Sequence, residues 1–219
     1  MDLMEALYQR RAVRHYTGEP VAKEAVSKLL LAATWAPSAV NQQPWAFGVI
    51  QGRERLAEYS ERAKRHLFAH LPQALALHRR SDQLTSADYN VFHHAGTVIV
   101  IFAKPSEFSA GEDCCLAAQN LMLAAHALGL GTCPIGFVRP WFELPETKSE
   151  LGISLRCTAI MPIAVGHPAG KSEPIRRLEP EIVCWSETAG EMPKPVPSAP
   201  PAIGPSDRLV AERDAGRRT

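Results

Sequence analysis

The chain has 219 residues, of which 46% are hydrophobic and 21% are charged, a composition that is ordinary for a packed globular protein. The 24 Lys and Arg residues nearly balance the 23 Asp and Glu residues, so the net charge of +1 argues against a nucleic-acid binder driven by bulk charge. The longest strongly apolar stretch, Val98–Ala103, is far shorter than the roughly 20 residues that cross a bilayer, so we expect no association with a membrane.

The first half of the chain is expected to hold three helices and one strand. The periodicity is clearest in the second helix, where Val26, Leu29 and Ala33 recur on one face together with Leu30, and Pro37 follows its end. Residues 71–89 fit no single element. In chain order the expected elements are a helix over Leu3–Arg10, a helix over Val21–Trp35, a strand over Trp45–Ile50 and a helix over Arg53–His70.

The second half begins with a continuous β-branched run, Thr97–Ala103, which is typical of a strand buried on both faces. A helix is expected after Ser109, because Ser109 and Glu112 have the spacing of a capping box and Gly129 lies where a C′ glycine belongs. Its expected apolar stripe is Ala117, Leu121, Ala124 and Leu128, and further strands are expected over Thr158–Val165 and Ile182–Trp185. This irregular alternation indicates an α+β fold or a mixed α/β sandwich around one sheet.

The composition changes near the C-terminus. Six of the 18 prolines lie between residues 193 and 205, and large apolar side chains are scarce after Ala189. We therefore expect a folded domain over 1–188 and a flexible Pro-rich tail over 189–219. The five cysteines form no CxxC pair and the N-terminus lacks the pattern of a signal peptide, which favours reduced thiols and a cytoplasmic location.

Three arginines follow the first helix closely, at Arg10, Arg11 and Arg14. The guanidinium group offers a rigid fork of donors suited to phosphate, although a solvated basic turn would show the same residues. A second basic pair, Arg176 and Arg177, lies far along the chain and by itself indicates a surface pair.

Two loops carry further signals. The segment Ala36–Trp45 contains two prolines and the polar residues Ser38, Asn41, Gln42 and Gln43, which suit recognition of a planar heterocycle, although a capped helix–strand turn would show them too. The glycines of Gly129–Gly136 lack the GxGxxG spacing and follow a helix, so we reject a dinucleotide fingerprint. Gly131 and Gly136 instead predict a tight loop where the backbone approaches something closely.

Other candidates are weak. His66 and His70 have a metal-compatible spacing, but no third ligand completes a site, so we expect no metal. Cys114 and Cys115 open a helix, where a thiolate would be favoured, yet small buried residues explain them better. The sequence contains no GxSxG, HExxH or P-loop motif, and we assign no catalytic side chain.

Taken together and in this order, four segments resemble the FMN-dependent nitroreductase family. The second and third are specific as a pair, whereas each alone would be only suggestive, and the resemblance runs from about residue 4 to residue 185. The segments are Arg10–Tyr16 (RRAVRHY), Ala36–Phe47 (APSAVNQQPWAF), Gln119–Gly131 (QNLMLAAHALGLG) and Val165–Pro168 (VGHP).

The resemblance implies a three-layer α/β/α sandwich with a central, mostly antiparallel sheet. It also implies an interlocked homodimer with two FMN sites in the subunit interface. Arg10, Arg11 and Arg14, in a motif whose usual serine is Ala12, would hold the phosphate and ribityl groups, and Arg176 or Arg177 would close on the phosphate.

The remaining site residues are implied in the same way. Pro37, Ser38 and Asn41, together with Gln43, would reach the flavin from the other subunit, and Ile135 and Gly136 would run along the isoalloxazine ring. Reduced nicotinamide, as NADH or NADPH, and then a small acceptor such as a nitroaromatic or a quinone would bind in turn over the flavin, with hydride passing through FMN N5.

Two positions depart from the family pattern and keep alternatives open. Ala12 removes one hydroxyl donor to the cofactor, and Cys133-Pro134 stand where many members carry an aromatic residue. The alternatives are a flavin-binding protein without turnover, a structural homodimer whose arginines stabilise an interface, and a flavin-cleaving enzyme like dimethylbenzimidazole synthase. That last branch typically has an acidic residue at the place of Ala12 and glycine at the place of Asn41, and both differences count against it.

Overall fold

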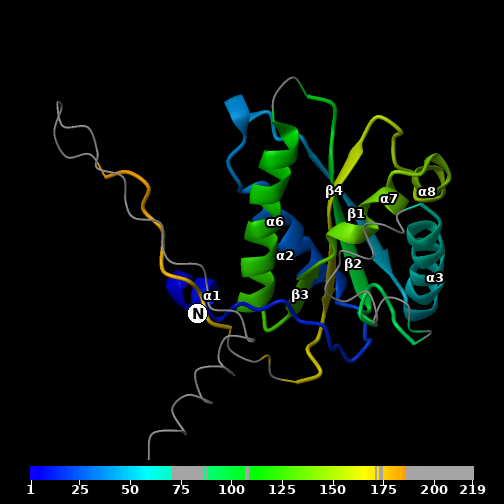
Figure 1. The fold of residues 1–219 in the computed structure, drawn as a ribbon, viewed down its shortest axis with the longest axis horizontal. Coiled ribbons are helices and arrows are strands. Elements are labelled where there is room, and N and C mark those ends of the chain that lie inside the picture. The colour runs from blue at the N-terminus through cyan, green and yellow to red at the C-terminus, as the bar shows by residue number, and fades with distance from the viewer. Residues whose placement is uncertain (71–85, 87, 107–108, 171, 173–174, 186–219) are drawn as a thin grey trace, which may run out of the picture. The chain divides into compact units, whose positions relative to one another are not determined.

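The structure, a computed structural model, describes residues 1–70, 86, 88–106, 109–170, 172 and 175–185 (Figure 1). The chain divides into two units, Met1–Pro174 and Ile175–Thr219. The predicted tail, the boundary at residue 188 and most of the segment 71–89 lie outside the described residues. In chain order the elements are α1 (Leu3–Gln9), α2 (Lys23–Thr34), η1 (Ala39–Asn41), β1 (Trp45–Gln51), α3 (Arg53–His70), β2 (Thr97–Ala103), α6 (Ala110–Ala127), β3 (Gly131–Pro134), η2 (Gly136–Val138), α7 (Arg139–Phe142), α8 (Pro145–Glu150) and β4 (Thr158–Gly166).

The sheet has four strands in the order β1-β2-β4-β3, and every neighbouring pair is antiparallel. All seven residues of β2 are buried, because β2 is an inner strand with helices on both faces, which explains its uninterrupted apolar sequence. The strands expected over 45–50, 97–103 and 158–165 are therefore confirmed. Strand β3 was not predicted: its four residues include Gly131 and Pro134 and carry no strand pattern, and it lies where a tight loop was expected.

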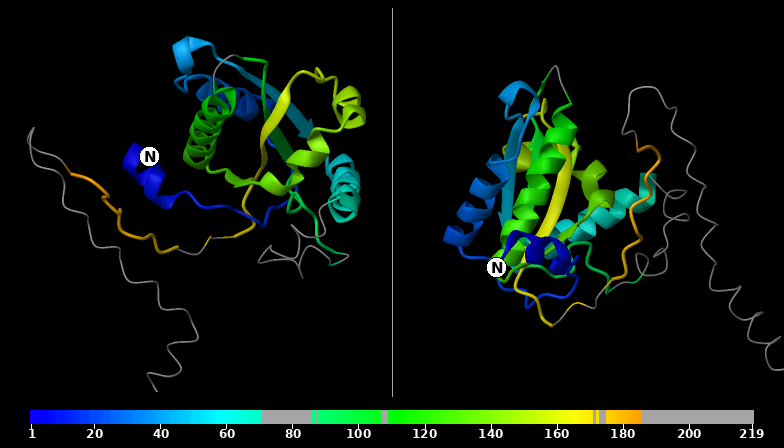
Figure 2. Two further views of the ribbon diagram at one scale, coloured as in Figure 1. Left: turned by 45° about the horizontal axis from the view of Figure 1, so that its top comes forward. Right: turned by 90° about the vertical axis from the view of Figure 1, so that its left-hand side faces the viewer.

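Helices cover both faces of the sheet and make three layers (Figure 1, Figure 2). On one face, α2 and α6 pack Leu29 and Leu121 against Ile101 of β2. On the other face, α3 and α7 pack Leu56 and Phe142 against the sheet. The helices predicted over residues 3–10, 21–35 and 53–70 are confirmed to within two residues at each end.

The C-terminal cap of helix α6 agrees with the prediction and its N-terminal cap does not. Gly129 has a φ of 74°, and the N–H groups of Gly129 and Leu130 donate to the carbonyls of His126 and Ala125 at 3.0 and 2.8 Å, which is a Schellman cap and confirms the predicted C′ glycine. The predicted capping box is wrong. Ser109 is the N-cap residue, but its backbone (φ −65°, ψ 58°) is not extended and its side chain caps no N–H group.

The buried face of α6 differs in part from the predicted stripe. Ala117 and Leu121 are buried as expected, but Leu128 is 45% exposed because it is the C-cap residue, beyond the last helical turn. The buried face continues instead through Ala125, one turn after Leu121.

The strand expected over Ile182–Trp185 is wrong. These residues belong to the second unit, have irregular backbone and leave Val183 and Trp185 77% and 69% exposed. A strand requires β-pairing to a neighbouring strand, and the described sheet and β-bridges do not include this segment.

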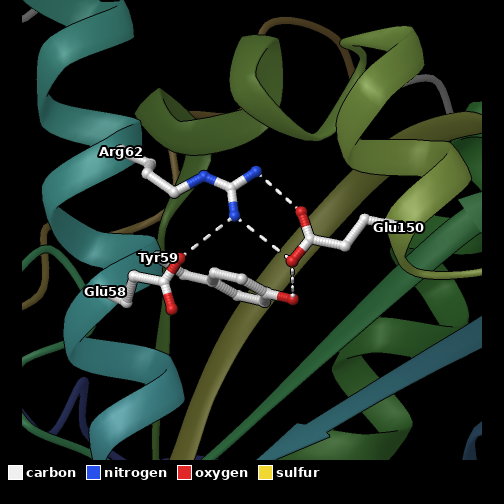
Figure 3. A network of polar contacts seen from close by, with 4 residues as sticks. All are labelled: Glu58, Tyr59, Arg62 and Glu150. Atoms are coloured by element: carbon white, nitrogen blue, oxygen red, sulfur yellow. Dashed lines mark hydrogen bonds and ion pairs between the residues drawn. The ribbon is translucent and has the colours of Figure 1, made fainter.

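A network of polar contacts joins helix α3 to helix α8 (Figure 3). Arg62 donates to both carboxylate oxygens of Glu150, at 3.2 and 2.7 Å, and the hydroxyl of Tyr59 donates to the same carboxylate at 2.7 Å. The Arg62 guanidinium also lies 5.2 Å from the centre of the Tyr59 ring and 5.7 Å from that of Trp141. The Arg62 guanidinium and then the Tyr59 hydroxyl hold the pKa of the Glu150 carboxyl below its usual range.

We expect Glu150→Gln to lower the free energy of unfolding at neutral pH by roughly 0.5 kcal/mol, since this pair is partly exposed. The folded-state pKa lies below the unfolded-state value, so this stabilisation is present above the unfolded-state pKa and is lost as the pH falls through the folded-state pKa. Urea unfolding at neutral and acidic pH measures the difference between variant and wild type. A difference that stays the same at low pH contradicts the prediction, and Glu146→Gln, an exposed carboxylate in α8, is the control.

Candidate functional site

The segment that carries Arg10, Arg11 and Arg14 lies beside the first residues of β3. Ala12 forms an isolated parallel bridge with Thr132, and the N–H of Val13 donates to the Thr132 carbonyl at 2.9 Å. Val13 packs so tightly over Gly131 that a Cβ at Gly131 would lie 2.8 Å from the Val13 side chain. The close approach predicted for Gly131 is therefore confirmed, and the approaching group is Val13.

Tyr16 fastens the far end of this segment. Its ring packs on Gly166 at the end of β4, where a Cβ would lie 3.0 Å from the ring, and its hydroxyl donates to the Val13 carbonyl at 2.7 Å. Burial raises the pKa of this hydroxyl well above its usual range, so it remains a donor. The N–H of Ala169 donates to the His15 carbonyl at 2.9 Å, which ties the turn after β4 to the same segment.

The three arginines differ in exposure and in their contacts. Arg10 and Arg11 are half-buried and Arg14 is exposed. Arg11 donates to the carbonyls of Tyr8 and Arg10 at 2.6 and 3.0 Å, and Arg14 donates to the Ala12 carbonyl at 3.4 Å. Neither Arg11 nor Arg14 forms an ion pair with any residue that the structure describes, so no described carboxylate neutralises their charge.

A cavity of about 500 Å³ lies beside this segment. Its lining includes residues from three segments quoted for the family resemblance, Arg10–Tyr16, Gln119–Gly131 and Val165–Pro168. Arg14, Ile135 and Gly136 do not line the cavity. The Nε2 atom of His126, on the last turn of α6, is buried without a hydrogen-bond partner in the described structure. The lining includes Arg10, Arg11, His126, Gly129, Thr132 and Pro168.

Ile135 and Gly136 continue the edge strand β3 into η2. Ile135 is 1% exposed and its N–H donates to the Pro162 carbonyl at 2.8 Å, so this residue still pairs with β4, whereas Gly136 begins η2 and its carbonyl accepts from the N–H of Arg139. Gly136 is exposed, its φ lies outside the left-handed region, and a Cβ there would meet no described atom within 4 Å. The close approach predicted for Gly136 therefore has no partner among the described residues of this chain.

The loop with Pro37, Ser38, Asn41 and Gln43 lies at the other end of α6 (Figure 1). The N–H of Ala39 donates to the Asp113 carboxylate in the first turn of α6, whereas the cavity touches Gly129 beyond the last turn. Eighteen residues of α-helix span about 27 Å, so this loop and the arginine segment of one chain lie far apart.

Two predicted groups fall elsewhere. Arg176 and Arg177 are exposed in the second unit, so their role toward a phosphate stays a prediction. Cys114 is fully buried, and burial first, then the neighbouring Cys115, raises the pKa of its thiol to about 12. Cys114 is thus a small buried residue and not a thiolate. Within the described ranges, no group of three or more His, Cys, Asp or Glu side chains is arranged to hold a metal ion.

Comparison with known proteins identifies the fold and its family. The model of the nitroreductase family matches residues 7–167, about three quarters of the chain. The chain belongs to the nitroreductase family.

Three proteins of known name or structure are similar to this chain. An FMN reductase (NAD(P)H) of Bacillus subtilis is 30% identical over 193 residues, which cover 85% of this chain and 74% of that protein. A crystal structure of a nitroreductase with bound FMN from Bacteroides fragilis matches with a TM-score of 0.70 and 25% identity, over 85% of this chain and all of that one. A 5,6-dimethylbenzimidazole synthase of Rhodospirillum rubrum is 27% identical over 192 residues, which cover 81% of this chain and 87% of that protein.

These matches, with the antiparallel sheet between helical layers, confirm the predicted nitroreductase-like α+β sandwich. No helix in the described part of the chain has the length and apolar character to span a membrane. Tyr16, His126 and Asp113 are residues of the candidate functional site that the sequence did not predict. The first two lie inside segments quoted for the family resemblance, but their contacts, with Val13 and Gly166 for Tyr16 and with the cavity for His126, exist only in the folded chain.

We expect Gly131→Ala to lower the free energy of unfolding by about 2 kcal/mol, because the added methyl group has to displace Val13 and the arginine segment with it. Chemical denaturation measures this change. Gly136→Ala is the matched control, since its methyl group meets open space, and its effect should stay within about 0.5 kcal/mol. Equal stabilities of Gly131→Ala and wild type would show that the Val13 contact is not tight.

Proposed function

We propose that this nitroreductase-family protein binds FMN between two copies of the chain and uses NADH or NADPH to reduce a small acceptor such as a nitroaromatic or a quinone. The observation that carries the proposal is the outer edge of β3. The arginine segment covers this edge at Thr132, and the chain then continues past Pro134, the last residue of β3, to the exposed Gly136 at the start of η2.

The arginine segment has the chemistry of a phosphate site. Arg10, Arg11 and Arg14 bring three permanent cations to one stretch of backbone that β3 and Tyr16 hold in place. The head groups of Arg11 and Arg14 donate to carbonyl oxygens, so their positive charge is oriented without being cancelled by a described carboxylate. A phosphate dianion at this position would accept charge-assisted hydrogen bonds and reduce the repulsion between the guanidinium groups.

The residues that follow β3 leave space for a flat ring. Thr132 lies in β3 and Gly136 begins η2 directly after it, so one continuous segment of four to five residues runs from the arginines to the exposed glycine, on the order of 10 Å of backbone. Gly136 leaves space that no described side chain fills, and Ile135 anchors this backbone in the core. The lack of a Cβ at Gly136 is explained if an isoalloxazine ring lies against it.

A second copy of the chain is required for the loop at the other end of α6 to reach this ligand. Pro37, Ser38, Asn41 and Gln43 are held by the first turn of α6, about 27 Å from its last turn. One ligand therefore contacts both the loop and the arginines only when each comes from a different chain. Large exposed apolar side chains, such as Leu7 and Tyr8 on α1 and Leu116 on α6, supply surface that a homodimer would bury.

The protein and the cofactor would have different roles in the reaction. When bound, FMN supplies the hydride-transfer chemistry, and the protein supplies position and charge. The arginines hold the phosphate, the β3 edge orients the ring, and the partner's loop covers it and excludes water. Ala12 contributes backbone but no hydroxyl donor, so the phosphate depends on the guanidinium groups.

The visible absorption spectrum of the purified protein tests this function. We expect a yellow protein with a flavin spectrum that NADH or NADPH bleaches in the absence of oxygen and that a quinone or nitroaromatic restores. A flavin spectrum without nicotinamide oxidation, even with acceptors present, would indicate a flavin-binding protein without turnover. A colourless protein that does not bind added FMN would indicate a structural homodimer and contradict the proposal.

Substitution of an arginine tests the phosphate site. We expect Arg14→Ala to raise the dissociation constant for FMN by at least about tenfold, because one charge-assisted hydrogen bond is lost. Fluorescence titration of the apoprotein with FMN measures the change. Arg65→Ala removes an exposed arginine from α3 and should leave the affinity unchanged. If Arg14→Ala changes the stability of the dimer and not the FMN affinity, the arginine is structural.

A further inference from the structure

The loop from Pro37 to Pro44 has an unusual backbone. Val40, Asn41 and Gln43 have φ values of 44°, 57° and 49°, in the left-handed region that residues other than glycine seldom enter and β-branched residues enter least. The Val40 side chain is 76% exposed, so burial of that side chain does not stabilise its backbone. Backbone of this kind persists where surrounding contacts over-determine it, and it concentrates in parts of proteins that recognise ligands.

Hydrogen bonds between side chains and backbone hold the second half of the loop. The N–H of Gln43 donates to the Ser38 hydroxyl at 3.0 Å, and the Gln43 side-chain amide donates to the Asn41 side-chain carbonyl at 3.1 Å. The Ser106 hydroxyl donates to the Gln42 side chain at 2.5 Å. Asn41 and Gln43 thus form a joined pair of amides on an exposed surface.

The first half of the loop depends on one carboxylate from α6. Asp113 is 7% exposed, and both of its oxygens accept from the N–H of Ala39, at 3.3 and 3.2 Å. Among the described residues, Ala39 is the one donor to this side chain, and no described cation pairs with it. A buried carboxylate is costly unless it is hydrogen-bonded, so Asp113 and Ala39 each depend on the other.

Asp113 stands on a rigid support. The next residue, Cys114, is fully buried, and Ala117 follows one turn later against the sheet. The carboxylate therefore transmits the position of α6 to the loop. Neighbouring Glu112, in the same turn, is exposed and makes no contact with Ala39 that would substitute for Asp113.

We propose that Asp113 is a positioning residue for flavin recognition: it fixes the turn at Ala39, so that the Asn41–Gln43 amide pair meets the FMN of a second copy in one orientation. This inference rests on the function proposed above. Asp113 touches no ligand and acts through the loop. A preformed loop loses less conformational entropy on binding than a mobile one, so loss of Asp113 weakens binding without removing a ligand contact.

The test compares Asp113→Ala, which removes the acceptor of the Ala39 N–H, with Glu112→Ala, which removes the same charge from the same helical turn. Hydrogen exchange of the segment 36–44, followed by mass spectrometry on the full-length protein, reports the order of the loop. Fluorescence titration with FMN reports the affinity, and thermal unfolding reports stability. For Asp113→Ala we expect faster exchange in this segment and a dissociation constant about tenfold higher, whereas Glu112→Ala should show neither change, and both variants should still unfold cooperatively.

Two results would overturn the proposal. Unchanged exchange would show that Asp113 does not hold the loop, and faster exchange with unchanged FMN affinity would show that its role is structural. If Asp113→Ala fails to fold, Asp113→Glu keeps the charge but moves the carboxylate by one methylene, and the same two changes are expected of it. Absence of FMN binding by the wild-type protein is a separate result, which overturns the proposed function and with it the flavin role of Asp113.

Discussion

The hydrogen bond from Val13 to Thr132 determines where the arginine segment lies. This bond joins the segment to β3, and β3 pairs with β4, which pairs in turn with the fully buried strand β2. Each step is a backbone pairing, so the position of the arginine segment is set by the buried sheet. Because Gly131 lacks a Cβ, Val13 can lie this close to the edge of the sheet.

Helix α6 has a second role besides covering the sheet. Its first turn holds the loop with Asn41 and Gln43 through Asp113, and its last turn ends at the cavity beside Arg10. One rigid element thus sets the distance between two groups of residues that the proposed function brings to the same ligand. Since that distance exceeds what one ligand spans, the second group has to come from another copy of the chain.

The sequence predicts the elements that carry their own pattern and misses those that depend on neighbours. The apolar run of β2 and the glycine cap of α6 are local signals, and both are confirmed. Strand β3 is four residues long with Gly131 and Pro134, and it is a strand because β4 pairs with it. The expected strand at Ile182–Trp185 has suitable residues, but it belongs to no strand or β-bridge in the described part of the chain. In the candidate site, arginines and amides are visible by residue type, whereas the contacts of Tyr16 and Asp113 exist only after folding.

A site built from opposite ends of α6 has a genetic consequence. In the proposed homodimer, each site takes its arginines from one chain and its loop from the other. A chain damaged at Arg14 and a chain damaged at Asn41 would therefore form a mixed dimer in which both defects fall on the same site, and the other site is intact. Two inactive alleles would then restore part of each other's activity when expressed together, whereas two alleles damaged at the same end of α6 would not.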